Sequence, residues 1–213
     1  MEIKQTSLQE IRPKAVLLFG APGSGKGTIG SMVSAAGNHY HLSSGEVFRG
    51  LPPESEFGRL FHSYATRGVL VPDDLTIEIW RRYVSGLIDT NRFYPRTQIL
   101  LLDGLPRTAA QAKILDQYVE VMQVIVLDIK DEQQIIRRIR RRAALENRPD
   151  DQQEAVILNR IHEYNQKTIE VLKHYPAEIT TVINAENSTL EVLRDILDRC
   201  MKVLNQHMFN IMM

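Results

Sequence analysis

The chain has 213 residues, enough for one compact domain or for one domain with a small insertion. Its 26 basic residues balance its 26 acidic residues, and this zero net charge disfavours a dedicated nucleic-acid-binding protein. Hydrophobic residues make up 43% and charged residues 24%, a composition that excludes a wholly disordered chain and a coiled coil. The single cysteine, Cys200, cannot form an intrachain disulfide, so we expect a reducing, cytoplasmic location.

Long apolar runs are missing from the sequence. No stretch reaches the roughly 18 consecutive apolar residues of a membrane span, and the first residues carry early charge where a secretory signal has an apolar segment. We therefore expect neither a membrane span nor a secretory signal.

Short apolar runs alternate with helical patterns along the chain. Strands are expected at 15–19, 39–42, 99–103, 123–128 and 179–183. Helices are expected up to about 36, over most of 44–90, at 108–119 with Thr108 as its N-cap, at 131–144, at 150–174, and after Ser188. This alternation predicts an α/β fold with a parallel sheet of about five strands, covered on both faces.

A glycine-rich loop follows the first expected strand. Residues 20–26 have the spacing G-x-x-x-x-G-K between a strand and a helix, which is the context that a phosphate-binding loop requires. Backbone amides at a helix N-terminus point at phosphate oxygens, and Lys26 adds a positive charge. The residue after Lys26 is Gly27, where the general motif has Ser or Thr as a magnesium ligand; Thr28 comes one residue later.

Four segments in chain order resemble motifs of the adenylate kinase branch of the nucleoside monophosphate kinases. They are 20–28, 41–49, 68–72 and 102–111, within a resemblance that covers about residues 15–200. The resemblance implies a P-loop NTPase three-layer fold in a single domain, 1–213, with a helical monophosphate-binding insertion at 44–75 and a short lid at 143–149. It also implies phosphoryl transfer from MgATP to AMP.

The resemblance divides the candidate site residues between two nucleotides. Those expected to bind ATP are Gly23, Ser24, Gly25, Lys26, Gly27, Thr28, Arg138 and Arg142. Those expected to bind AMP are Ser44, Arg49, Val71, Gly104, Arg107, Gln111, Arg148 and Arg160. Catalysis is expected from Lys26, Arg107, Arg138, Arg142, Arg148 and Arg160. Arginine suits these roles because its planar guanidinium binds phosphate bidentately.

Two further residue types bear on metals. Asp103 ends an apolar strand, where a carboxylate can hold Mg²⁺ through water, so Mg²⁺ is the expected cofactor. Five residues separate Arg142 from Arg148, too few for a zinc-bearing lid, and they include no Cys or His. We therefore expect no zinc. Asp150 and Asp151 follow, and we expect them to cap the next helix or to orient the lid arginines.

Ser44 and Gln111 favour AMP as the acceptor. In the adenylate members of the family a hydroxyl and a glutamine occupy these two positions, and an amide can pair with the adenine edge through both its donor and its acceptor. A UMP/CMP kinase on the same fold is the first alternative. A non-catalytic adenine-nucleotide- or RNA-binding protein is the second, suggested by the additional arginines Arg137, Arg140 and Arg141. We expect a monomer with small-molecule substrates.

Overall fold

The computed structural model describes residues 8–146, 151 and 153–212, with the backbone alone for 204–212. Five strands form one sheet in the order β2-β3-β1-β4-β5, and every neighbouring pair is parallel. The strands are β1 (Lys14–Gly20), β2 (His39–Ser43), β3 (Ile99–Asp103), β4 (Glu120–Asp128) and β5 (Thr180–Asn184). The predicted parallel α/β sheet is therefore confirmed.

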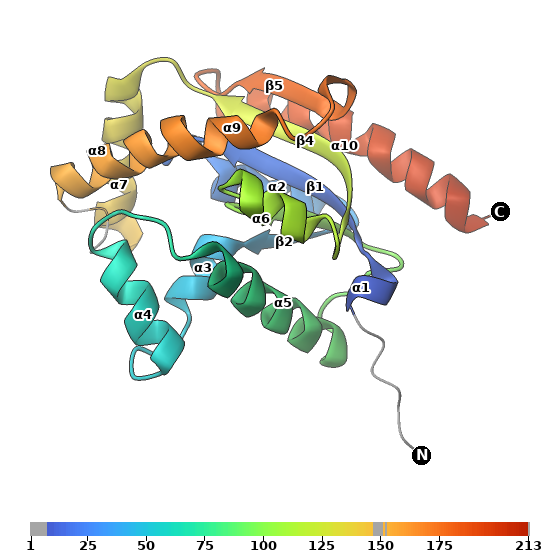
Figure 1. Cartoon of the computed structure of the whole chain (residues 1–213). Coiled ribbons are helices and arrows are strands. Elements are labelled where there is room, and N and C mark those ends of the chain that lie inside the picture. The colour runs from blue at the N-terminus through green and yellow to red at the C-terminus, as the bar shows by residue number, and fades with distance from the viewer. Residues whose placement is uncertain (1–7, 147–150, 152, 213) are drawn as a thin grey trace.

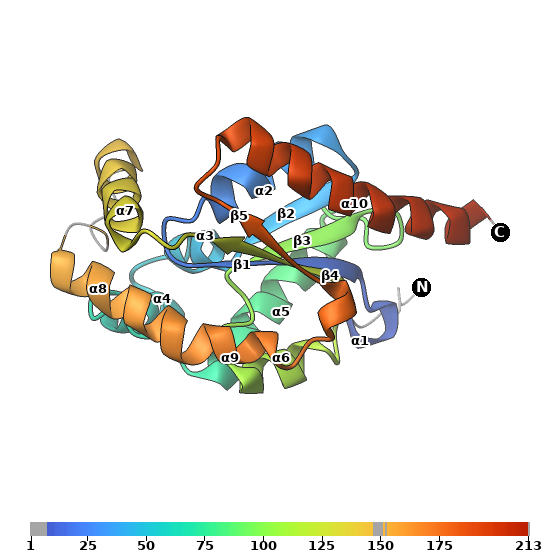
Figure 2. The same ribbon diagram turned by 90° about the horizontal axis from the view of Figure 1, so that it is seen from above.

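The near-continuous apolar character of the strands follows from helices on both faces of the sheet (Figure 2). Along β1, Leu17 and Phe19 point into one core and Val16 and Leu18 into the other, because successive side chains of a strand alternate between faces. Helices α5, α6 and α9 cover the first face, and α2 and α10 cover the second. The result is a three-layer domain.

Most helices begin and end close to where the sequence predicts. Their bounds are α1 (Leu8–Ile11), α2 (Lys26–Ala36), α3 (Ser44–Arg49), α4 (Glu56–Ala65), α5 (Asp73–Asp89), α6 (Ala109–Leu115), α7 (Glu132–Glu146), α8 (Glu154–Glu163), α9 (Ile169–Leu172) and α10 (Thr189–Met212). The Thr108 hydroxyl accepts from the backbone N–H of Gln111 at 3.1 Å, as an N-cap should. Ser188 and Glu191 form a reciprocal capping box before α10.

The structure differs from the predicted helices at two places. Helix α6 ends at Leu115, four residues before the predicted end, and a turn leads into β4. The segment predicted as helical over 150–174 contains a π-helical turn, η2 (Tyr164–Thr168), between α8 and α9, and a 3₁₀ turn, η3 (Ala177–Ile179), follows before β5. A single π turn is too short to produce a hydrophobic period that the sequence could show. Such turns are often found at functional sites.

The predicted insertion, 44–75, contains α3 and α4 and leads into α5 beside the sheet (Figure 1). Of the predicted lid, 143–149, the described part is 143–146, the last residues of α7. Cys200 is 1% exposed in the core beneath α10, as its place on the apolar stripe predicts. Among the helices the structure describes, none is both long and apolar enough to cross a membrane.

Candidate active site

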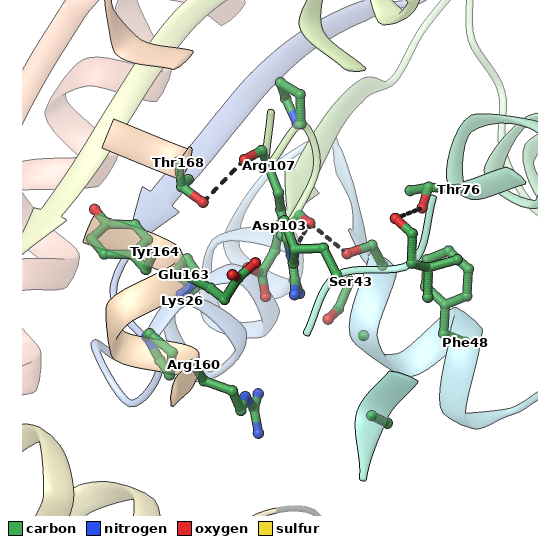
Figure 3. Close-up of a pocket in the computed structure, with 18 of the residues that line it drawn as sticks. Lys26, Ser43, Phe48, Thr76, Asp103, Arg107, Arg160, Glu163, Tyr164 and Thr168 are labelled. Carbon is green, nitrogen blue, oxygen red and sulfur yellow. Dashed lines mark hydrogen bonds between the residues drawn. The ribbon is translucent and has the colours of Figure 1, made fainter. Parts of the chain in front are cut away.

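A pocket opens at the carboxyl ends of β1, β2 and β3, where open α/β sheets bind their ligands (Figure 3). Among the described residues, five basic side chains line it against two acidic ones, although the whole chain has no net charge. The basic residues are Lys26, Arg49, Arg107, Arg142 and Arg160, and the acidic residues are Asp103 and Glu163. The excess of positive charge makes the pocket an anion site.

The glycine-rich loop brings Lys26 to the floor of this pocket. Gly20 has φ +148°, and a Cβ on it would lie 2.5 Å from the Ser24 hydroxyl and 2.7 Å from the Leu127 carbonyl oxygen, so a side chain there would disrupt the turn. The Lys26 ammonium curls back over the loop and donates to the carbonyl oxygens of Gly20, at 2.7 Å, and Ala21, at 3.0 Å. The loop therefore holds its own cation where a phosphate would bind.

The pKa of Lys26 is lowered to about 8, chiefly by burial; the carboxylate of Asp103 acts in the opposite direction, and the nearby Arg107, Arg142 and Arg160 make smaller contributions that lower it. Burial likewise lowers the pKa of Arg107 to about 10, with Arg160 as the next cause. Both pKa values are lowered first by burial and then by the neighbouring cations, which repel one another. Bound phosphate oxygens would relieve that repulsion, since each anion favours the protonated forms around it.

The carbonyl of Gly104 joins two residues on the acceptor side. It accepts from the Ser44 hydroxyl at 2.8 Å and from Nε of Arg107 at 2.7 Å. Gly104 has φ +78°, and a Cβ there would lie 2.7 Å from the Ser44 oxygen. This turn therefore requires glycine and aligns the Arg107 guanidinium. The backbone carbonyl of Arg107 in turn accepts from the Thr168 hydroxyl at 3.3 Å, on the π turn (Figure 3).

Gln111 is 1% exposed and has both ends of its amide engaged. Its oxygen accepts from the backbone N–H of Arg107 at 2.7 Å, and its Nε2 donates to the Asp73 carboxylate at 2.8 Å. Its side chain also lines the pocket. The amide predicted to contact a base is therefore held from two sides.

Apolar side chains line the same pocket as this amide. Phe48 and Phe61 stack with their ring centroids 5.6 Å apart and an interplanar angle of 16°. Both line the pocket together with Leu70, Val71 and Thr76. A pocket lined by aromatic and aliphatic side chains and by one fixed amide suits a heteroaromatic ring.

Two of the predicted lid arginines converge on one buried acid. Arg142 donates to Oδ2 of Asp151 through Nε, at 3.0 Å, and Nη2, at 2.5 Å, and Arg160 donates to Oδ1. Asp151 is fully buried, while both arginines remain partly exposed to the pocket. This geometry agrees with the prediction that an aspartate orients the lid arginines. Asp150 and Arg148 lie outside the described residues.

The remaining predicted residues fall into two groups. The first group lines the pocket and consists of Lys26, Ser44, Arg49, Val71, Asp103, Gly104, Arg107, Gln111, Arg142 and Arg160. The predicted ATP residues Gly23, Ser24, Gly25, Gly27 and Thr28 form the loop and the first turn of α2, outside the pocket lining. Arg138 is half-buried on α7 and does not line the pocket either.

Several lining residues are not predicted by sequence reasoning. Thr168, Tyr164 and Glu163 reach the pocket from the end of α8 and from the π turn. Asp73, which bonds to Gln111, is also new, because an acidic residue in the first turn of a helix is common and attracts no functional interpretation. The additional arginines are partly explained: Arg137 pairs with Asp131 at 3.2 Å and Arg140 with Glu154 at 2.6 Å.

Asp103 fits the role of a magnesium ligand. Its carboxylate is 6% exposed at the end of β3, lines the pocket, and lies close enough to Lys26 to raise that group's pKa. Its nearest basic neighbour in β2, His41 Nε2, lies 4.0 Å away. Within the described residues no group of three or more His, Cys, Asp or Glu side chains could hold a metal by itself. Mg²⁺ needs no such group when phosphates and water complete its shell.

Comparison with known proteins agrees with this site. Residues 18–180 match the adenylate kinase family. Named adenylate kinases from Flavobacterium psychrophilum and Azobacteroides pseudotrichonymphae are each 35% identical, covering 89% and 85% of this chain and 97% and 94% of their own length. One from Chlamydia muridarum is 32% identical and covers 87% of both chains. The phosphate loop, the arginine pocket and these matches agree, and the chain belongs to the adenylate kinase family.

Proposed function

We propose that this protein transfers the γ-phosphoryl group of MgATP to AMP and produces two ADP. The observation that carries the proposal is the convergence in one pocket of Lys26, Asp103 and four arginines with apolar side chains and the Gln111 amide. Phosphoryl transfer depends on positioning and charge neutralisation more than on covalent chemistry, and this pocket supplies both.

Each group of residues has a distinct role in the proposed reaction. The loop amides and Lys26 bind the phosphates of the donor. Arg49 and Arg107 bind the phosphate of AMP, whose oxygen attacks the terminal phosphorus of ATP as the bond to the β-phosphate oxygen breaks. Arg142 and Arg160 stabilise the negative charge on the transferring group. Magnesium, held by Asp103 through water, would neutralise further phosphate charge.

The proposed reaction needs no general base, because the attacking phosphate oxygen is already ionised near neutral pH. Water must instead be excluded, since water competes with AMP for the phosphoryl group. We propose that the insertion at 44–75 and the lid at 143–149 close over the bound nucleotides, and that Arg138 and Arg148 complete the donor and acceptor sites on closure. The cytoplasmic location, the monomeric state and the lack of zinc also stay predictions.

Phosphorus NMR of the purified protein with MgATP and AMP, repeated with UMP and CMP, tests the function. Rapid formation of ADP with AMP, and little reaction with UMP or CMP, is expected. The variant Lys26→Met should lower kcat by orders of magnitude, because the donor loses its positive partner. Preferred turnover of UMP or CMP would refute AMP as the acceptor. Near-normal turnover by Lys26→Met would refute the donor site.

A further inference from the structure

Asp73 does not line the pocket itself, but it contacts Gln111, which does. It is the first residue of α5, and its carboxylate accepts the 2.8 Å hydrogen bond from Gln111 described above. The two residues are 38 positions apart in the sequence, and the bond ties the start of α5 to the first turn of α6. Gln111 is 1% exposed, so its hydrogen bonds to the protein are largely shielded from bulk water.

The partners of Gln111 determine which way its amide points. The backbone N–H of Arg107 can only donate, so the group that faces it at 2.7 Å must be the amide oxygen. The ionised carboxylate of Asp73 can only accept, so the group that faces it must be the amide nitrogen. Turning the amide by 180° would set a donor against a donor and an acceptor against an acceptor, both shielded from water.

The fixed amide still has hydrogen-bonding capacity to spare. An amide carries two N–H donors and two acceptor lone pairs, and within the described residues the Asp73 carboxylate uses one donor and the backbone N–H of Arg107 uses one lone pair. The remaining N–H and lone pair are available to a ligand in the pocket that Gln111 lines. Asp73 and Arg107 determine which end of the amide offers the donor to a ligand and which end offers the acceptor.

We infer that Asp73 is a positioning residue that gives the acceptor site its selectivity for adenine over a 6-oxopurine. Adenine presents an acceptor at N1 and a donor at its 6-amino group. Hypoxanthine presents the reverse, a donor at N1 and an acceptor at its 6-oxygen. A Gln111 amide locked in one orientation complements the first pattern and opposes the second, whereas an amide free to turn accommodates both. This inference rests on the proposed function, because it assumes that the acceptor base lies against Gln111.

The variant Asp73→Asn is the test, with AMP and IMP as acceptors. An asparagine amide can donate or accept, so it can satisfy Gln111 in either orientation, while the Arg107 N–H continues to favour the native one. We therefore expect relaxed selectivity: the ratio of kcat/KM for IMP to that for AMP should rise about tenfold. Calorimetric binding of AMP and IMP reads the same selectivity without turnover.

The variant Asp74→Asn is the matched control. Asp74 is the next residue in the first turn of α5, it is exposed, and it does not line the pocket. Its substitution removes the same charge from the same helix terminus but leaves the Gln111 amide untouched, so the IMP-to-AMP ratio should stay at the wild-type value. If Asp73→Asn does not fold, Asp73→Ser replaces it, because a hydroxyl can also donate or accept.

Each result separates the inference from the proposed function. A raised ratio in Asp73→Asn with an unchanged ratio in Asp74→Asn supports the inference. Equal losses for AMP and IMP in Asp73→Asn, or an equal rise of the ratio in both variants, would overturn it and leave a merely structural role for Asp73. If the wild-type protein binds AMP more tightly than IMP but transfers no phosphoryl group, the proposed function fails while the selectivity inference is still decided by the binding ratios.

Discussion

Arg142 on α7 and Arg160 on α8 are bridged by the two oxygens of one fully buried carboxylate, that of Asp151. Two cations that lie this close would otherwise repel each other and turn away from the pocket. The shared anion holds both guanidinium groups at the pocket wall. A buried charge with two partners is also costly to disturb, because the loss of the anion removes a counter-charge that both partly buried cations share.

Asp151→Asn should therefore impair both catalysis and stability. We expect kcat to fall at least tenfold, since the arginines lose their alignment, and the free energy of unfolding to fall by about 3 kcal/mol. Steady-state kinetics and urea denaturation measure the two effects. Glu154→Gln is the control: it removes an exposed pair with Arg140 from the same part of the molecule, and its effect on stability should stay within about 1 kcal/mol. Equal effects of the two substitutions would contradict a special role for Asp151.

The lowered pKa of Lys26 predicts a specific pH dependence. In the free protein Lys26 loses its proton above about pH 8, so productive binding of ATP at higher pH requires uptake of a proton. The kcat/KM for ATP should therefore fall above about pH 8, approaching tenfold per pH unit. The kcat should stay constant up to a higher pH than kcat/KM, because the phosphates of bound ATP raise the pKa of Lys26 again. Steady-state kinetics measured between pH 6.5 and 9.5, in steps of roughly half a pH unit, follow both parameters.

Lys26→Arg provides the control for that profile. A guanidinium keeps its charge throughout this range, so the variant, whatever its absolute rate, should show no fall in kcat/KM near pH 8. A wild-type profile that is level up to pH 9.5, or an identical fall in the arginine variant, would show that another group is responsible.

The turn at Gly104 yields a third prediction. Alanine there would need φ near +78° and would press its Cβ against the Ser44 hydroxyl, so Gly104→Ala should move Arg107 out of line. We expect kcat/KM for AMP to fall about 10- to 100-fold while ATP binding, measured by calorimetry, changes little. Gly86→Ala, at an exposed position of α5 where nothing lies within 4 Å of the new methyl group, should preserve activity and stabilise the helix. A parallel loss of ATP binding in Gly104→Ala would indicate a general collapse of the pocket.

The parts of the site that consist of consecutive residues can be predicted from the sequence, whereas contacts between segments far apart in the chain cannot. The loop around Lys26 and the strand that ends at Asp103 carry their chemistry in consecutive residues, so their spacing alone places them at the same edge of the sheet. The bond between Asp73 and Gln111 joins two segments whose separation follows no period, and Asp73 resembles any acidic residue at a helix start.

The arginine-rich helix shows the same limit. Helical spacing puts Arg138 and Arg142 on one face of α7, yet of these two Arg142 alone lines the pocket, because it lies one turn closer to Asp151. Arg137 pairs with Asp131, which precedes α7, and Arg140 pairs with Glu154, which begins α8, so a helical wheel of α7 contains neither acidic partner. These pairs reduce the exposed positive charge on which the RNA-binding alternative depended.

A buried histidine far from the loop chemistry should control the acid stability of the protein. His39 is 4% exposed on the edge strand β2, neither of its ring nitrogens has a hydrogen-bond partner within the described structure, and burial lowers its pKa to about 4. The unfolded chain, with a histidine pKa of about 6.5, binds more protons than the folded chain between pH 6.5 and 4. The contribution of His39 to stability is therefore complete above about pH 6.5 and is lost as the pH falls through about 4.

This linkage predicts a loss of about 3 kcal/mol in the free energy of unfolding between pH 6.5 and 4 in addition to that of other groups. In His39→Leu, which fills a similar volume and cannot be protonated, the acid loss should be smaller by that amount when measured by urea denaturation at several pH values. His162→Gln, at an exposed position on α8, should leave the wild-type pH dependence unchanged. If His39→Leu loses as much stability in acid as the wild type, the proton that destabilises the folded state binds elsewhere, and the buried, unpartnered ring of His39 is not the acid-sensitive element of the sheet edge.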